Sequence, residues 1–112
     1  MSSIIIGSFT PVLSSGGSGG GSSSVPHKKS FVIGVSDMMP GDSRYVLNAN
    51  IIQYSLSVVL DGVYINEQIT SNDPDLNYTV TYGATTTITF WQSGVLKPLD
   101  SGTVVLTYST AT

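Results

Sequence analysis

Residues 77–108, with the sequence NYTVTYGATTTITFWQSGVLKPLDSGTVVLTY, contain three runs in which side chains alternate between two kinds. A period of two places alternate side chains on one face of a pleated strand, and Thr, Val, Ile and Tyr favour such strands. Gly83-Ala84 and the segment Ser93–Gly102 separate the runs, so we predict three β-strands joined by turns. The positions expected to share a face are Tyr78, Val80 and Tyr82 in the first run, Thr86, Ile88 and Phe90 in the second, and Val104, Leu106 and Tyr108 in the third.

Further strands are predicted upstream of this region. The segment Gln53–Leu60 alternates in the same way, and Asp61-Gly62 separates it from Val63-Tyr64-Ile65. An Asp-Gly pair between two such runs predicts a hairpin with a two-residue turn. Ser30–Val35 is a further strand candidate, and no segment shows a sustained helical period. The chain is therefore predicted to be all-β, as a small antiparallel β-sandwich of the immunoglobulin-like or jelly-roll-like kind.

The first 24 residues differ in composition from the rest. Residues 1–13 form a predicted N-terminal β-arm centred on Ile4, Ile5 and Ile6, and three isoleucines in a row suit a strand that is covered on both faces. Residues 14–24 are eleven consecutive Gly and Ser residues, the composition of a flexible linker, either engineered or a natural low-complexity loop. The sandwich domain is predicted to span residues 25–112, and the arm to add a strand to it or to a neighbouring subunit.

Composition limits the classes of function. Only 10% of the 112 residues are charged and the net charge is −3, with Lys28-Lys29 as the one pair of neighbouring cations. A nucleic-acid-binding face needs a clustered basic surface, so no nucleic-acid partner is expected. There is no cysteine and no apolar segment of about 20 residues, and neither disulfides nor a membrane span are expected. The N-terminus lacks the pattern of a signal peptide, so we expect synthesis in a host cytoplasm.

Residues that could carry chemistry are few. His27 is the only histidine and is predicted to be an exposed linker residue, and Asp61 and Glu67 are the only carboxylates outside clear loops. The segment Asn72–Asn77 is rich in side-chain oxygens that suit a hard cation, but the same residues form Asx turns, which we favour. We expect no enzyme activity, no cofactor and no metal site.

Three residues outside the arm are candidates for contact with a partner. Phe90 and Trp91 are adjacent in a predicted strand, so they point to opposite faces and one of them lies outside the core. We expect Trp91 at an interface, where tryptophan is enriched. Met38 and Met39 are also predicted contact residues, since methionine adapts to irregular surfaces, although they could instead cover one end of the sandwich. The tyrosines together with Trp91 could alternatively form a sugar-stacking face.

The order of turns from Leu60 onward is similar to that of the small β-domains of bacteriophage tail-fibre and related virion proteins. In this chain Leu99 stands where that family usually has glycine before the turn aspartate. The resemblance covers about half of the chain. The segments that carry it are Asp61-Gly62-Val63-Tyr64, Asp75-Leu76-Asn77-Tyr78-Thr79-Val80, Thr87-Ile88-Thr89-Phe90, Leu96-Lys97-Pro98-Leu99-Asp100 and Val104-Val105-Leu106-Thr107-Tyr108.

The resemblance implies a structural protein of the virion, without an active site, that acts as an oligomer and often as a trimer. We therefore expect a phage fibre, baseplate or capsid-decoration module that assembles with itself and with other virion proteins through strand addition and apolar contacts. The alternative is a carbohydrate-binding or receptor-binding sandwich that recognises a glycan on the host surface.

Overall fold

The computed structural model describes residues 23–112 and is built from β-strands joined by turns and loops. The described part contains no helix, and so none that is long and apolar enough to cross a membrane. The strands are β1 (Ser24–Val32), β2 (Arg44–Leu47), β3 (Ser57–Leu60), β4 (Val63–Glu67), β5 (Asn77–Thr81), β6 (Thr86–Gln92), β7 (Val95–Leu96) and β8 (Thr103–Ala111).

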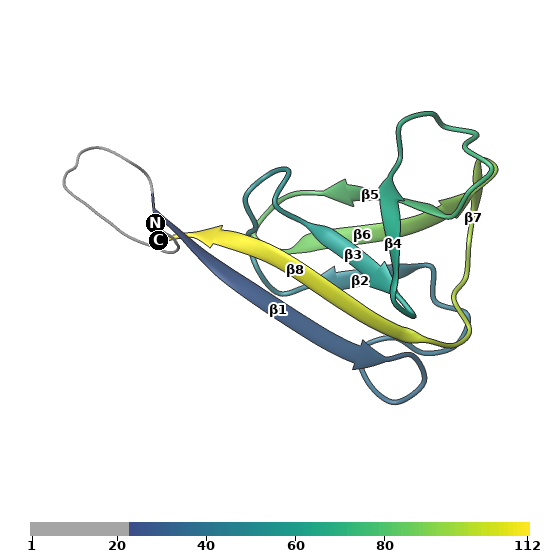
Figure 1. Cartoon of the computed structure of the whole chain (residues 1–112), viewed down its shortest axis with the longest axis horizontal. Coiled ribbons are helices and arrows are strands. Elements are labelled where there is room, and N and C mark those ends of the chain that lie inside the picture. Colours follow the sequence, from purple (N-terminus) through teal and green to yellow (C-terminus); the bar gives the residue numbers. More distant parts are fainter. Residues whose placement is uncertain (1–22) are drawn as a thin grey trace.

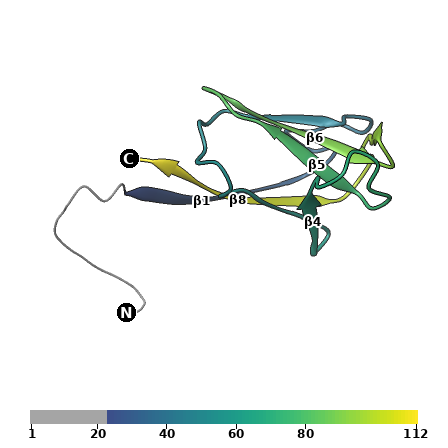
Figure 2. The ribbon, with the colours of Figure 1, turned by 90° about the horizontal axis from the view of Figure 1, so that it is seen from above.

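The strands form one sheet in the order β1-β8-β3-β4-β5-β6-β2, with β7 added to β6. The sheet curls like half a barrel, so that β1, β8 and β3 lie opposite β2, β6 and β5 (Figures 1 and 2). Its two edge strands, β1 and β2, are joined by the loop 33–43. The predicted arm of residues 1–13 lies outside the described residues.

The core lies on the concave side of the curl, and the alternation in the sequence explains it. In β6, Thr86, Ile88 and Phe90 are buried on one face. On the other face Thr87 and Trp91 are half-buried, and the polar residue Thr89 between them is buried. In β8, Val104 and Leu106 are buried in the same core. The predicted period-two faces are therefore confirmed for these strands. The buried apolar residues are Phe31, Ile33, Met38, Tyr45, Leu47, Ile51, Val58, Tyr78, Ile88, Phe90, Leu99, Val104 and Leu106.

The predicted hairpin at Asp61-Gly62 is confirmed. Leu60 and Val63 are cross-strand partners, and the two turn residues have positive φ values of 50° and 81°. Positive φ at both central residues is the requirement of a type I′ turn, which explains the Asp-Gly sequence.

Other local predictions were wrong. The strand predicted for Gln53–Leu60 begins only at Ser57, because Tyr54 takes a left-handed conformation (φ 71°) that ends regular alternation. The strand predicted at Ser30–Val35 instead spans Ser24–Val32, since Gly34 (φ 93°) opens a turn. The sheet is also not purely antiparallel, because β4 and β5 run parallel.

The parallel pair depends on a buried side chain. The segment 68–76 connects β4 to β5, which is shorter than the dozen or more residues that usually link parallel strands. Asn77 is 1% exposed, donates from Nδ2 to the Asp75 carbonyl (2.6 Å) and accepts at Oδ1 from the Gln68 side chain (3.1 Å). The Gln68 backbone N–H donates to the Tyr78 carbonyl (2.7 Å). These bonds fold the connection onto the start of β5.

The turn residue Asp61 provides a test of this fold. Its carboxylate Oδ1 accepts a hydrogen bond from the Thr103 N–H (2.9 Å), which ties the hairpin to β8. Asp61→Ala removes this bond. It also places alanine, whose side chain cannot hydrogen-bond to the nearby backbone, at a positive φ. We therefore expect a loss of about 1–3 kcal/mol in the free energy of unfolding. Asp61→Asn keeps an acceptor oxygen and tolerates the same backbone, and serves as the matched control in chemical denaturation. Equal stability of the two variants would contradict this role for Asp61.

Candidate functional site

The free side of β1 is the most extensive unpaired feature of the described residues. Ile33 N–H donates to the Gly102 carbonyl (2.9 Å), and Thr112 N–H donates to the Ser23 carbonyl (3.5 Å) at the other end of an unbroken register. In an antiparallel ladder, every second residue directs its N–H and C=O to the partner strand. The odd-numbered residues of β1 therefore face β8, and the even-numbered residues face outward.

The outward row is interrupted at one place. Lys28, Ser30 and Val32 each direct an N–H away from β8, and within residues 23–112 no backbone group accepts them. Pro26 has no N–H, and it occupies an outward position where a proline costs no ladder bond. The edge therefore presents three consecutive donors, bounded on one side by a proline.

Asp37 links β1 to β2, the strand at the other end of the sheet order. The Lys29 Nζ lies 3.3 Å from Asp37 Oδ1, and the Tyr45 hydroxyl donates to the same oxygen at 3.2 Å. The rings of Phe31 and Tyr45 lie 4.9 Å apart at their centroids. Residues of β1, the loop and β2 thus meet in one contact, which we call the seam (Lys29, Phe31, Asp37 and Tyr45).

The seam alters the proton affinity of its groups. Partial burial acts to raise the pKa of Asp37, but hydrogen bonds from Ser36, Lys29 and Tyr45 and the charge of Lys29 together hold this pKa below its ordinary value. Burial raises the pKa of the Tyr45 phenol well above its ordinary value, and the neighbouring Asp37 carboxylate adds to the shift. The seam is therefore built around an ionised carboxylate and a neutral phenol.

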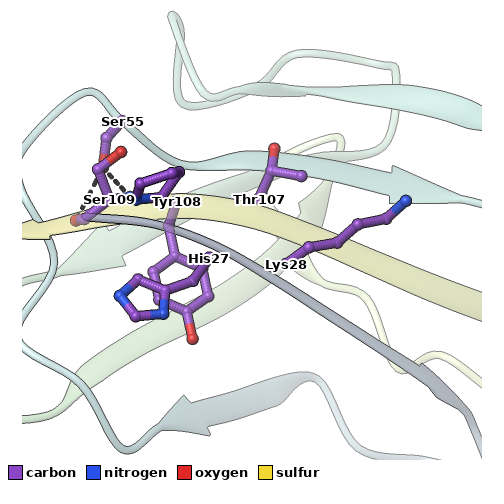
Figure 3. A pocket seen from close by; sticks show the side chains of 7 residues that line it. His27, Lys28, Ser55, Thr107, Tyr108 and Ser109 are labelled. Carbon is purple, nitrogen blue, oxygen red and sulfur yellow. Dashed lines mark hydrogen bonds between the residues drawn. The ribbon is translucent and has the colours of Figure 1, made fainter. Parts of the chain in front are cut away.

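His27 was predicted to be an exposed linker residue. It is exposed, but it belongs to strand β1. Its ring stacks on Tyr108 (Figure 3), with centroids 5.1 Å apart and an angle of 15°. The His27 Nε2 lies 2.8 Å from the Thr110 hydroxyl. The side chains of His27 on β1 and of Tyr108 and Thr110 on β8 therefore contact one another across the two adjacent strands. No group of three or more His, Cys, Asp or Glu residues that could hold a metal ion occurs in the part of the chain that the structure describes.

An open depression of about 480 Å³ lies over the projecting part of β1 and β8. Figure 3 shows the Lys28 and Thr107 side chains on one side of the β8 ribbon and the rings of His27 and Tyr108 on the other. Ser55 fixes one wall, since its hydroxyl accepts from the Ser109 N–H (3.1 Å) and donates to the Ile52 carbonyl (2.6 Å). The depression is open and its lining is both polar and apolar, without a convergent set of titratable groups.

The predicted contact residues are not brought together. Met38 is 0% exposed and fills the core from the loop 33–43, so it is not available to a partner, whereas Met39 is 51% exposed. Trp91 is half-buried on the convex face, where its indole N–H donates to the Thr79 hydroxyl (2.9 Å). Ile4, Ile5 and Ile6 lie outside the described residues.

The remaining candidates have structural partners. Asp61 is used by its turn, and Glu67 is exposed at the end of β4. In the segment Asn72–Asn77, Asp73 Oδ1 accepts from the Asp75 N–H (3.0 Å), which is the Asx turn that the sequence favoured.

Sequence reasoning included Tyr54 among the tyrosines of a possible sugar-stacking face but did not single it out from those expected to line the core. Its side chain is 81% exposed and its φ is 71°, a conformation that is rare for a bulky residue. The Tyr82 hydroxyl lies 3.4 Å from the Tyr54 backbone nitrogen, which donates to it. No signal in the sequence marks this position, because Tyr54 continues the alternation of the residues after it.

Comparisons of the chain with models of protein families, with curated proteins and with solved structures found no match.

Because of the seam, we predict that the stability of the fold decreases at low pH. Because the folded pKa of Asp37 is lowered, its contribution is present above the unfolded value of about 3.8 and is lost as the pH falls through the folded pKa. Asp37→Asn keeps a residue that tolerates the local φ of 65° but removes the charge. In denaturation curves between pH 7 and pH 2, we expect the variant to be less stable at pH 7 and to show a smaller decrease on acidification. Parallel curves for the two proteins would exclude this role.

Proposed function

We propose that this chain is a non-enzymatic structural module of a virion, of the fibre, baseplate or capsid-decoration kind, that assembles through a sheet edge and apolar contacts. The observation that carries the proposal is the free side of β1, a nine-residue strand with a row of open backbone donors. Such an edge is a template for strand addition from another chain. The resemblance of residues 60–108 to virion β-domains supplies the biological setting.

The described surface also favours a structural role over catalysis. The one histidine stacks on Tyr108, and the depression next to it lacks a nucleophile paired with a base. Exposed apolar residues supply contact area instead. They include Val32, Val35, Met39, Val46, Val63, Ile69 and Val95.

In the assembled state we propose that the curled sheet acts as a small β-sandwich and that residues 1–13 form its arm. The two halves of the curl already bury one core between them, which supports the sandwich description. Added backbone pairing at β1 would extend the half that contains β8 and β3. A trimer is the expected assembly, made inside the host cell without a membrane or nucleic-acid partner.

Closing the edge of β1 tests this function. Ser30→Pro removes an outward N–H while leaving the bonds between β1 and β8 in place, whereas Ser30→Ala keeps the donor. By light scattering we expect the native chain and Ser30→Ala to have three times the chain mass of 11.7 kDa, and Ser30→Pro to have the mass of a single chain. Circular dichroism and a thermal melt establish that Ser30→Pro is folded.

A native chain that is a single copy at all concentrations, with or without other virion proteins, would overturn self-assembly. An oligomer that is unchanged by Ser30→Pro would show that assembly uses another surface than β1.

Carbohydrate binding is the second candidate, and Tyr54 is the observation that favours it. An exposed aromatic ring held in an unfavourable backbone conformation is a feature of binding sites, and aromatic planes with a polar tip suit sugars. Ser55, the residue that follows Tyr54, lines the depression together with Thr107 and Ser109, and each of these three residues carries a hydroxyl.

Alanine variants of Trp91 and Tyr54 distinguish the structural function from carbohydrate binding. If Trp91 lies at an assembly contact, we expect Trp91→Ala to weaken self-association at least tenfold, with no binding in a glycan screen before or after the change. Tyr64→Ala, at another exposed aromatic residue, serves as the control. Glycan binding by the native chain that is lost in Tyr54→Ala, with an unchanged solution mass, would instead establish the carbohydrate-binding function.

A further inference from the structure

The free edge of β1 is poorly suited to pair over its whole length with a second copy of itself. In a two-fold antiparallel pairing of the strand Ser24–Val32, the central residue Lys28 would lie opposite its own copy. Like charges directly opposite each other destabilise a sheet. The partner strand should therefore lack positive charge opposite Lys28.

The chain itself contains a segment of suitable composition. Residues 3–10, with the sequence SIIIGSFT, carry no charge and no proline, and Pro11 follows them directly. Linker residues of the Gly/Ser kind connect this segment to β1 and have a root-mean-square reach of about 18 Å for their length. The described chain begins at Ser23, beside the projecting end of the β1–β8 ribbon and away from the opposite half of the sheet (Figure 1).

We propose that residues 3–10 of a neighbouring copy pair antiparallel with the free edge of β1. The inference rests on the proposed function, which supplies the neighbouring copy. It specifies which edge accepts the added strand and which segment donates it. Exchange of one segment around a closed ring uses a head-to-tail contact and is compatible with a trimer.

The positions of the two prolines define the register of this pairing. If Pro11 lies opposite Pro26, the two residues that lack an N–H share one rung, and the rungs at Lys28 and Ser30 keep both of their hydrogen bonds. The Val32 carbonyl already accepts the N–H groups of Val35 (3.0 Å) and Ser36 (3.3 Å), so the rung at Val32 gains only the bond from the Val32 N–H. Ile5 then lies opposite Val32, Gly7 opposite Ser30, and Phe9 opposite Lys28. The isoleucines of the arm meet the end of β1 that is next to the core.

Residue-resolved amide exchange on the full chain tests the pairing. We expect slow exchange at the outward amides of Lys28, Ser30 and Val32, and a rate at least tenfold higher at these three amides in Gly7→Pro, which lacks the N–H that would donate to the Ser30 carbonyl. The amides of Lys29 and Phe31 face β8 and provide an internal control that stays protected in both proteins. Gly7→Ala is the matched control, because it keeps the backbone donor.

Fast exchange at the outward amides of the native chain would overturn the proposal. Slow exchange that is unaffected by Gly7→Pro would also overturn it, since another segment would then occupy the edge. In either case an oligomer that Ser30→Pro dissociates would leave the proposed function standing.

A crosslink distinguishes a neighbour's arm from the arm of the same copy. The chain has no cysteine, so the double variant Gly7→Cys, Ser30→Cys can form only the disulfide under test or one between identical positions. On oxidation we expect covalent dimers and trimers in which position 7 of one copy is joined to position 30 of another, identified by mass spectrometry of the peptides. The single variants Gly7→Cys and Ser30→Cys control for disulfides between identical positions. A monomer with an internal disulfide between positions 7 and 30 would overturn the assignment to a neighbouring copy.

Discussion

The fold depends on one carboxylate that receives two donors from opposite ends of the sheet. β1 and β2 are the first and last strands in the sheet order, and no backbone ladder joins them. Asp37 accepts from Lys29 on β1 and from Tyr45 on β2, beside the contact of Phe31 with Tyr45. These contacts hold the curl closed at the end of the molecule where the loop 33–43 crosses. Without them, the concave faces of β1 and β2 would be open to water at that end.

The same loop also contributes to the core. Met38 follows Asp37 directly and is fully buried, which is worth roughly 1.5–3 kcal/mol for a side chain of this size. Gly34 N–H donates to the Met38 carbonyl (2.8 Å) and closes the loop on itself. One short connection thus supplies an ionic contact at the surface and an apolar side chain beneath it. This arrangement explains why an adjacent pair, Met38 and Met39, divides between core and surface.

Local alternation and turn chemistry were enough to predict the strands β5, β6 and β8 and the hairpin at Asp61-Gly62. In these segments the period of two and the positive φ of the turn act within a few residues. The long first strand was not predictable in the same way, because Ser24 to Lys28 have little apolar character and are ordered by pairing with β8. The parallel pair of β4 and β5 depends on Asn77, whose burial follows from contacts with Gln68 and Asp75. For the candidate site, sequence placed Trp91 off the core face but could not identify the free side of β1, which is defined by the strand order.

Pro26 has a consequence for solubility and for the reversibility of contacts. An exposed strand with an unbroken row of donors can recruit chain after chain into an aggregate. Here the proline ends the row, and Lys28 places a charge beside the first open donor. A strand that joins this edge gains only a short ladder, so the contact can dissociate and be remade. In the proposed assembly, such an edge would let subunits separate and pair again as the assembly grows.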